Sequence, residues 1–89
     1  MKLGETLRIF RIANNFSTKE VAKSIGMSST YVSEVESSHK NPSLETLKKF
    51  SSCFNVRVST LMEISEQSEE HQWNFQKTLL EILKIYVDE

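Results

Sequence analysis

Apolar side chains recur every three to four positions along most of this chain, which is the spacing of one face of an α-helix. We expect helices over about residues 3–14, 17–25, 28–37, 43–54 and 58–64. A polar stretch over residues 65–70 is expected to separate these five from a last helix over about residues 69–87. Because isolated helices below about 12 to 15 residues are marginal in water, the five must pack on one core.

Residues that cap helices stand at several of these expected boundaries. Ser17 and Glu20 have the spacing of a capping box, and Ser28 is suited to cap the third helix. Gly26 and Asn55 suit the left-handed conformation that ends many helices. The apolar faces between these boundaries predict a core, with Cys53 as a small member. The other residues of these faces are Leu3, Leu7, Ile9, Phe10, Ile12, Ala13, Val21, Ala22, Ile25, Val32, Val35, Leu44, Leu47, Phe50, Phe54, Val58, Leu61, Met62 and Ile64.

Composition narrows the class of protein. A chain of 89 residues suits one small domain and excludes a large enzyme with its own cofactor domain. Two glycines and one proline are too few turn residues for an all-β fold, so we expect an all-α protein. No window approaches the roughly 18 apolar residues of a membrane span, and the N-terminus lacks the apolar core of a secretory signal. With a single cysteine, these features predict a soluble cytoplasmic protein.

The formal net charge of −1 conceals an asymmetry along the chain. Residues 1–60 contain nine lysines and arginines against five acids, whereas residues 61–89 contain two against seven. The first part therefore carries a net charge of +4 and the second −5. Residues 1–60 can still present a positive surface to a polyanion, because salt screens the more distant acidic charges of residues 61–89.

Residues 17–37 have the spacing of a helix-turn-helix. Ala22 permits a close helix crossing, Gly26 permits a tight turn, and Val32 with Val35 fix the second helix to the first. The opposite edge of the second helix is then small and polar, which suits entry into the major groove of DNA. We expect base-reading contacts from Ser28, Ser29, Thr30, Ser33, Glu34 and Ser37.

Over residues 3–63 the sequence resembles the Cro and phage-repressor type (XRE-like) helix-turn-helix family. The resemblance is carried by Leu7, Arg11, Val21-Ala22, Gly26, Tyr31-Val32-Ser33, Val35-Glu36, Pro42-Ser43-Leu44, Leu47 and Leu61. It implies a five-helix DNA-binding domain, usually a dimeric repressor at a palindromic operator, with a recognition helix from Ser28. It also implies an ion pair from Arg11 to Glu36. Thr18 departs from a frequent glutamine of the family, and Ser38 from a common glycine.

The candidate phosphate contacts lie around this unit. They are Arg11, Ser17, Thr18, Tyr31, His39, Lys40 and Asn41. Glu34 could act in two ways on this surface. Its carboxylate could accept a hydrogen bond from cytosine N4 and so give specificity, or it could be repelled by phosphates and so weaken DNA binding. His39, Cys53 and His71 have no metal-ligand spacing, and no nucleophile motif is present. We therefore expect no metal, no cofactor and no enzymatic activity.

The last expected helix has apolar residues around half of its circumference, more than one core requires. We expect it to form a homodimer interface; the alternative is that it only covers the core of a monomer. The interface candidates are Trp73, Leu79, Leu80, Leu83, Tyr86 and Val87. The chain would then divide into a DNA-binding domain over residues 1–65 and a dimerisation helix over residues 66–89.

Two functions fit these features. The first is a dimeric, sequence-specific DNA-binding transcriptional regulator, acting as a repressor on double-stranded DNA. The alternative is a protein-interaction module, such as an antitoxin-like partner-binding protein on a helix-turn-helix fold, which the acidic and apolar C-terminal region also suits. A protein effector remains compatible with both.

Overall fold

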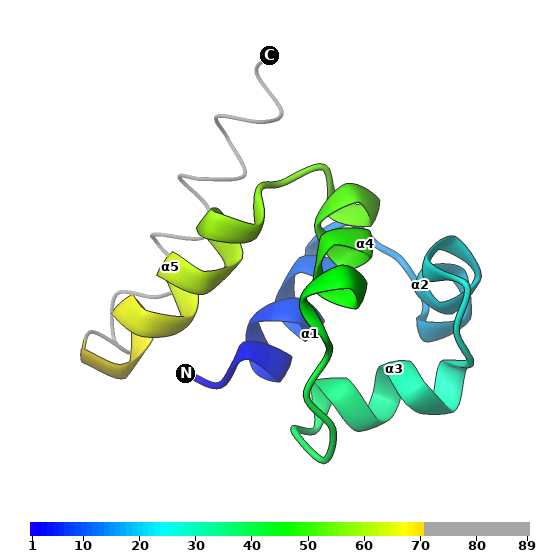
Figure 1. The fold of residues 1–89 in the computed structure, drawn as a ribbon, viewed down its shortest axis with the longest axis horizontal. Coiled ribbons are helices and arrows are strands. Elements are labelled where there is room, and N and C mark those ends of the chain that lie inside the picture. Colours follow the sequence, from blue (N-terminus) through cyan, green and yellow to red (C-terminus); the bar gives the residue numbers. More distant parts are fainter. Residues whose placement is uncertain (71–89) are drawn as a thin grey trace.

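The computed structural model describes residues 1–70, with side chains through Glu66. In this range the chain forms five α-helices and no strand, which confirms the expected all-α fold (Figure 1). The helices are α1 (Leu3–Ala13), α2 (Thr18–Ile25), α3 (Ser29–Glu36), α4 (Leu44–Phe54) and α5 (Val58–Glu70). The rest of the last expected helix and all six candidate dimer contacts lie outside the described residues.

Serine side chains begin three of these helices. Ser17 and Glu20 form the expected capping box, with Glu20 N donating to Ser17 Oγ over 3.0 Å and Ser17 N donating to Glu20 Oε1 over 2.9 Å. Ser28 Oγ accepts from Tyr31 N, and Ser43 Oγ accepts from Thr46 N. These bonds satisfy amides that have no acceptor within their own helix, so they fix where α2, α3 and α4 begin.

Helices α1 to α4 end in the same way, with one residue in the left-handed conformation. These residues are Asn15, Gly26, Ser38 and Asn55, with φ of 58°, 71°, 66° and 56°. In each case the next amide donates to the carbonyl five positions earlier, as His39 N does to Glu34 O over 2.9 Å. This is the Schellman arrangement, which satisfies carbonyls left open at the helix end. Gly26 and Asn55 were expected here, whereas Ser38 adopts a conformation that is usually unfavourable for a residue with a Cβ atom.

A single apolar core holds the helices together. Leu7, Phe10, Val21, Val32 and Val35 are fully buried in it. The rings of Phe10 and Phe54 stack with their centroids 6.0 Å apart. Helix α1 contacts α3, α4 and α5, and α2 packs against α3 and α4, so α3 is held by two helices on its inner side.

Some residues of the expected apolar faces lie outside this core. Ile12, Leu44 and Met62 are 54%, 62% and 43% exposed, and Ala13 is also exposed. Each short helix faces the core along one stripe only, so residues at the edge of its apolar face remain in water. Cys53 is half-buried at the edge of the core.

The expected break over residues 65–70 is wrong, because α5 continues through Glu70. This stretch lacks glycine and proline, and its serine, glutamate and glutamine side chains are compatible with a helix. Ser65 is also buried, with its hydroxyl 3.0 Å from that of Thr6 on α1 and donating to Leu61 O over 3.1 Å. The domain boundary expected after residue 65 therefore falls within a continuous helix.

Gly4 allows α1 to cross the end of α3 at close range. It is buried, and a Cβ atom placed there would overlap with the carbonyl oxygen of Val35. The same atom would lie 3.1 Å from both Glu36 O and Ser38 Oγ. Only a residue without a side chain fits this contact, which fixes the position of the C-terminal end of α3 against α1.

Candidate nucleic-acid interface

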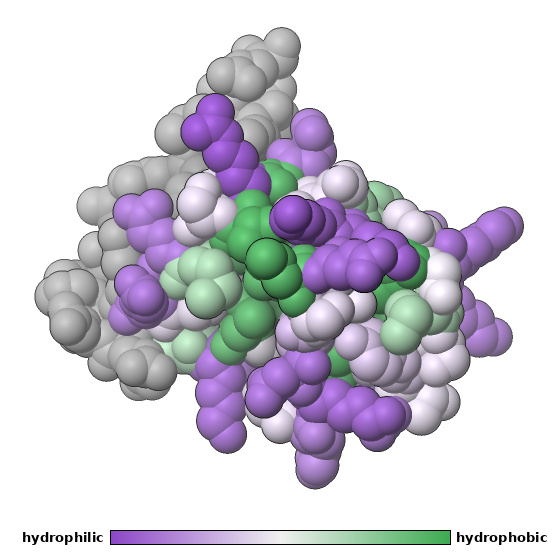
Figure 2. All heavy atoms as spheres, in the orientation of Figure 1, coloured by the Kyte–Doolittle hydropathy of each residue, from purple (hydrophilic) through white to green (hydrophobic). Residues whose placement is uncertain are grey.

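Helix α3 has two sharply different sides. Val32 and Val35 are fully buried, whereas Thr30, Ser33 and Ser37 are exposed on the side that faces away from the core. In Figure 1 this helix runs along the lower edge of the molecule, and mostly pale and purple residues cover that edge in Figure 2. The valines thus occupy the inner side and the short hydroxyl side chains the outer side, as the residue spacing predicts.

The other three candidate base-reading residues lie on or beside the same surface. Ser28 is exposed and caps the N-terminus of α3, and Ser29 in the first turn is half-buried. Glu34 lies one turn after Thr30 and is half-buried. We call these six residues, Ser28, Ser29, Thr30, Ser33, Glu34 and Ser37, the outer face of α3.

An ion pair braces the inner side of α3. Arg11 Nε donates to Glu36 Oε2 over 2.7 Å, and Arg11 Nη2 donates to Glu36 Oε1 over 3.1 Å. Arg11 Nη1 also donates to Phe16 O over 2.9 Å, so one side chain joins α1, the turn before α2 and α3. The hydrogen bonds that Arg11 donates to the Glu36 carboxylate raise the pKa of the Arg11 guanidinium. This confirms the pairing that the family resemblance implies.

The same bonds limit what Arg11 can offer to a phosphate. Its side chain is 15% exposed, and each of its three nitrogens already donates to Glu36 or Phe16. Arg11 therefore acts mainly as a structural support for α3, and only its remaining N–H groups are available to a ligand.

The loop after α3 folds back over the end of that helix. Lys40 N donates to Glu34 O over 3.2 Å, and Lys40 Nζ lies 3.7 Å from Glu34 Oε1. The same ammonium lies 5.9 Å from the centroid of the Tyr31 ring, within cation–π range. The carboxylate on the outer face of α3 thus has a cation beside it.

The remaining loop residues are polar and exposed. The Ser37 hydroxyl donates to Glu34 O over 3.2 Å. His39 Nδ1 lies 2.7 Å from the same hydroxyl oxygen. Asn41 is exposed directly after Lys40. The candidate phosphate contacts His39, Lys40 and Asn41 therefore form one hydrophilic edge next to the outer face.

The N-terminus of α2 supplies the other candidate phosphate contacts. Ser17 is exposed and Thr18 half-buried. The amides of Thr18 and Lys19, in the first turn, have no acceptor within their helix, and the positive end of the helix dipole favours an anion there. The Glu20 carboxylate accepts from Ser17 N and opposes that attraction. An anion at this end would therefore meet two open amides beside one negative side chain.

Comparison with known proteins places this architecture in a family. A family profile described as helix-turn-helix matches residues 7–61, more than half of the chain. The chain belongs to this helix-turn-helix family. Within that match, α2 and α3 are the two helices joined by the turn at Gly26.

Several relatives of this helix-turn-helix chain are named as regulators. It is 38% identical over 63 residues to the HTH-type transcriptional regulator DdrOP3 of Deinococcus deserti, covering 71% of this chain and 49% of that protein. It is 29% identical over 92 residues to the HTH-type transcriptional regulator ImmR of Bacillus subtilis, covering 100% of this chain and 71% of that protein. The match to DdrOP3 thus spans only about half of the length of that protein.

A solved structure shares the fold. The crystal structure of the clp gene regulator ClgR from Corynebacterium glutamicum matches with a TM-score of 0.75 at 27% identity. The match covers 94% of this chain and 88% of that one. The five-helix arrangement is therefore one that a gene regulator uses.

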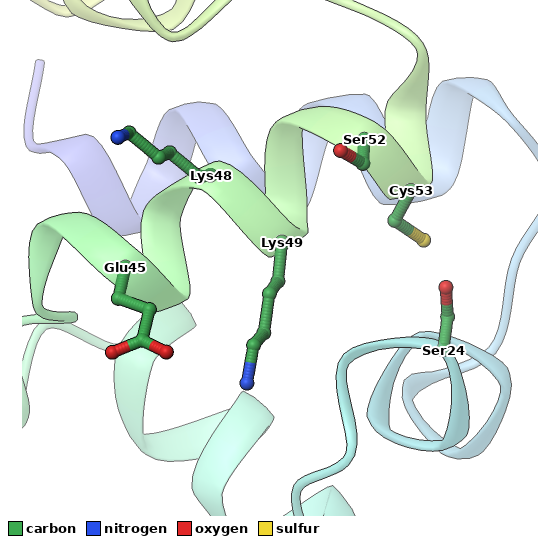
Figure 3. A pocket seen from close by; sticks show the side chains of 6 residues that line it. All are labelled: Ser24, Glu45, Lys48, Lys49, Ser52 and Cys53. Carbon is green, nitrogen blue, oxygen red and sulfur yellow. The ribbon is translucent and has the colours of Figure 1, made fainter.

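A second surface feature of the helix-turn-helix chain was not expected from sequence. An open groove of about 420 Å³ lies between α2 and α4 and is lined by Ser24, Glu45, Lys48, Lys49, Ser52 and Cys53. Figure 3 shows Ser24 and Cys53 facing each other across it, while Lys48 points away. None of the candidate site residues lines this groove.

Within residues 1–70, none of the helices has the length and apolar content needed to cross a membrane. The same part of the chain holds no group of three or more histidine, cysteine, aspartate or glutamate side chains arranged to bind a metal ion.

Proposed function

We propose that this chain is a sequence-specific DNA-binding transcriptional regulator that inserts α3 into the major groove. The observation that carries the proposal is the two-sided character of α3. Its inner side is fixed by Val32, Val35 and the Arg11–Glu36 pair, while its outer face presents short hydrogen-bonding side chains to solvent. A helix held rigidly with such a face outward suits the width of the major groove.

The outer face supplies the base-reading contacts in this proposal. Phosphate contacts come from its two flanks, the N-terminus of α2 and the loop after α3. The phosphate-contacting residues are Ser17, Thr18, Tyr31, His39, Lys40 and Asn41, with a minor contribution from Arg11. Because hydroxyl side chains usually make single hydrogen bonds, we expect modest base discrimination supplemented by DNA shape.

The regulator acts as a homodimer in this proposal, in the cytoplasm, and represses transcription by occupying a palindromic operator. Two copies of α3 would read half-sites about one helical turn, roughly 34 to 36 Å, apart. Trp73, Leu79, Leu80, Leu83, Tyr86 and Val87 would form the two-fold interface. Support for the interface comes from their sequence pattern, and support for a role in transcription comes from the relatives named as transcriptional regulators.

A binding titration tests DNA recognition directly. Fluorescence anisotropy of the full chain against random and selected duplexes, at two salt concentrations, should show salt-sensitive binding that is tighter for the selected duplex. Ser33→Glu should weaken binding at least tenfold, because a second carboxylate on the outer face would repel phosphates. Ser59→Glu adds the same charge on α5, where Ser59 is exposed, and should leave affinity nearly unchanged.

The absence of salt-sensitive binding at low ionic strength would reject this function. It would favour the alternative, a helix-turn-helix module whose partner is another protein. Equal losses from Ser33→Glu and Ser59→Glu would show that DNA is bound through net charge and not through α3.

Sedimentation of the full chain tests the dimer. The wild type should sediment with twice the monomer mass, and Leu83→Glu should shift it toward monomer by placing a charge in an apolar interface. Lys84→Glu, next to it in sequence, is the control that should keep the dimer. A wild type of monomer mass at micromolar concentration would reject the dimer without affecting DNA binding by α3.

A further inference from the structure

Glu34 is the single carboxylate on the outer face of α3, where the other five residues carry hydroxyl groups. Its side chain is 37% exposed, so the carboxylate is accessible from the solvent side. On that face it lies between Thr30 and Ser37, one helical turn from each. Any duplex that contacts Thr30 and Ser37 must therefore also meet the Glu34 carboxylate.

Lys40 is held next to this carboxylate from two directions. The left-handed Ser38 turns the chain back, and Lys40 N then donates to the backbone oxygen of Glu34 over 3.2 Å. Its ammonium lies 3.7 Å from Glu34 Oε1 and 5.9 Å from the Tyr31 ring centroid. In open water such a pair contributes little to stability, because exposed charges are screened. Its importance grows when DNA excludes water and brings phosphates close.

The chemistry of a carboxylate restricts what Glu34 can recognise. An ionised carboxylate only accepts hydrogen bonds, and the donors in the major groove are cytosine N4 and adenine N6. Adenine presents the acceptor N7 beside its amino group, which repels a carboxylate, so cytosine is the better match. Phosphates also repel a bare carboxylate, and the Lys40 ammonium offsets this repulsion.

We propose, on the basis of the DNA-binding function above, that Glu34 reads a cytosine of the half-site through its N4 amino group. Lys40 is the positioning residue in this mechanism: it neutralises and orients the Glu34 carboxylate so that it can enter the groove. The pair thus sets specificity at one base pair, while the hydroxyl side chains contribute to neighbouring positions.

The test begins with duplexes selected from a random library by the full wild-type chain. The selected site should contain a cytosine whose replacement by another base lowers affinity about 5- to 100-fold, the range of a good base contact. Replacing the same base by N4-methylcytosine should cause a similar loss, because the methyl group removes the donor in the groove and keeps base pairing. Glu34→Ala should abolish both preferences and bind other sequences as well or better. Glu66→Ala removes an exposed carboxylate from α5 and should keep both preferences.

A double substitution tests the role of Lys40. Lys40→Met should weaken binding to every duplex about tenfold or more, because the Glu34 carboxylate is then uncompensated next to phosphates. In the Glu34→Ala background the same change should cost at least threefold less. Lys48→Met, at an exposed position of α4, should have the same small effect in both backgrounds.

The outcomes separate the two proposals. If the wild type enriches no sequence, the DNA-binding function fails and takes this inference with it. If the wild type enriches a site whose base preferences are unchanged in Glu34→Ala, only the reading by Glu34 is rejected. If Lys40→Met costs the same with and without Glu34, the positioning role of Lys40 is rejected.

Discussion

The inner and outer sides of α3 follow different physical rules. The inner side combines fully buried valines with a charged pair that is satisfied by several hydrogen bonds. The outer side has exposed hydroxyl groups and one carboxylate with a lysine beside it. Substitutions on the inner side should therefore change the free energy of unfolding, whereas substitutions on the outer side should change what the folded protein binds.

The strongest test of this contrast removes one partner of the buried pair. Arg11→Met should lower the free energy of unfolding by about 3 to 5 kcal/mol, because Glu36 is left as a buried and unpaired carboxylate. Urea denaturation followed by circular dichroism measures the change. Arg57→Met removes an exposed arginine and should stay within about 0.5 kcal/mol of the wild type. A loss below about 1 kcal/mol for Arg11→Met would mean that the pair does not hold α3.

A smaller change in stability, opposite in sign to that of most glycine-to-alanine substitutions in helices, is expected at Gly4. Glycine to alanine within a helix normally stabilises it by about 0.5 to 1 kcal/mol. Here the added Cβ overlaps with the Val35 carbonyl, so Gly4→Ala should instead destabilise the protein by about 1 to 3 kcal/mol. Thermal melting of the variant beside Ser24→Ala, a substitution at an exposed position of α2, measures the difference. An increase in stability for Gly4→Ala would show that α1 and α3 do not approach this closely.

The smallest effect on stability is expected on the outer face. Thr30 is exposed, and alanine is the better helix former, so Thr30→Ala should leave the free energy of unfolding within about 0.5 kcal/mol. The affinity of this variant for a selected duplex should nevertheless fall about fivefold, which corresponds to the loss of one base contact worth about 1 kcal/mol. Thermal melting checks the expected stability of the variant, and fluorescence anisotropy checks its expected affinity for DNA. A large loss of stability would mean that Thr30 belongs to the folded framework.

Much of the fold follows from local signals in the sequence. Ser17, Glu20 and Ser28 fix helix starts because capping depends on residues three positions apart, and Gly26 and Asn55 fix helix ends for the same local reason. The burial of the valines of α3 follows from helical spacing. The residues of the outer face were also identified in this way, although their roles in binding remain predictions.

Features that depend on tertiary contact were not predicted. Gly4 has no local reason to be glycine, because the constraint comes from the carbonyl groups of α3. The burial of Thr6 against Ser65 joins residues 59 positions apart, so local spacing could not show it, and the polar stretch over residues 65–70 was expected to separate two helices. Spacing alone also could not show which apolar positions, such as Leu44, would remain in water.

The contact between Glu34 and Lys40 was missed for a related reason. Residues six positions apart do not face each other on a helix, so no periodic pattern connects them. The pair forms because Ser38 reverses the chain direction after α3. The Arg11–Glu36 pair, in contrast, was expected only through the family resemblance.

The left-handed turn at Ser38 also bears on how a protein of this kind can diverge. One residue inserted directly after Ser38 would leave every apolar position of α3 in place, and the helices would still pack. The lysine would then project in another direction, and the carboxylate would lose its counter-charge. If Glu34 reads a base as proposed, base preference would then change with the length of this loop, without a substitution in α3.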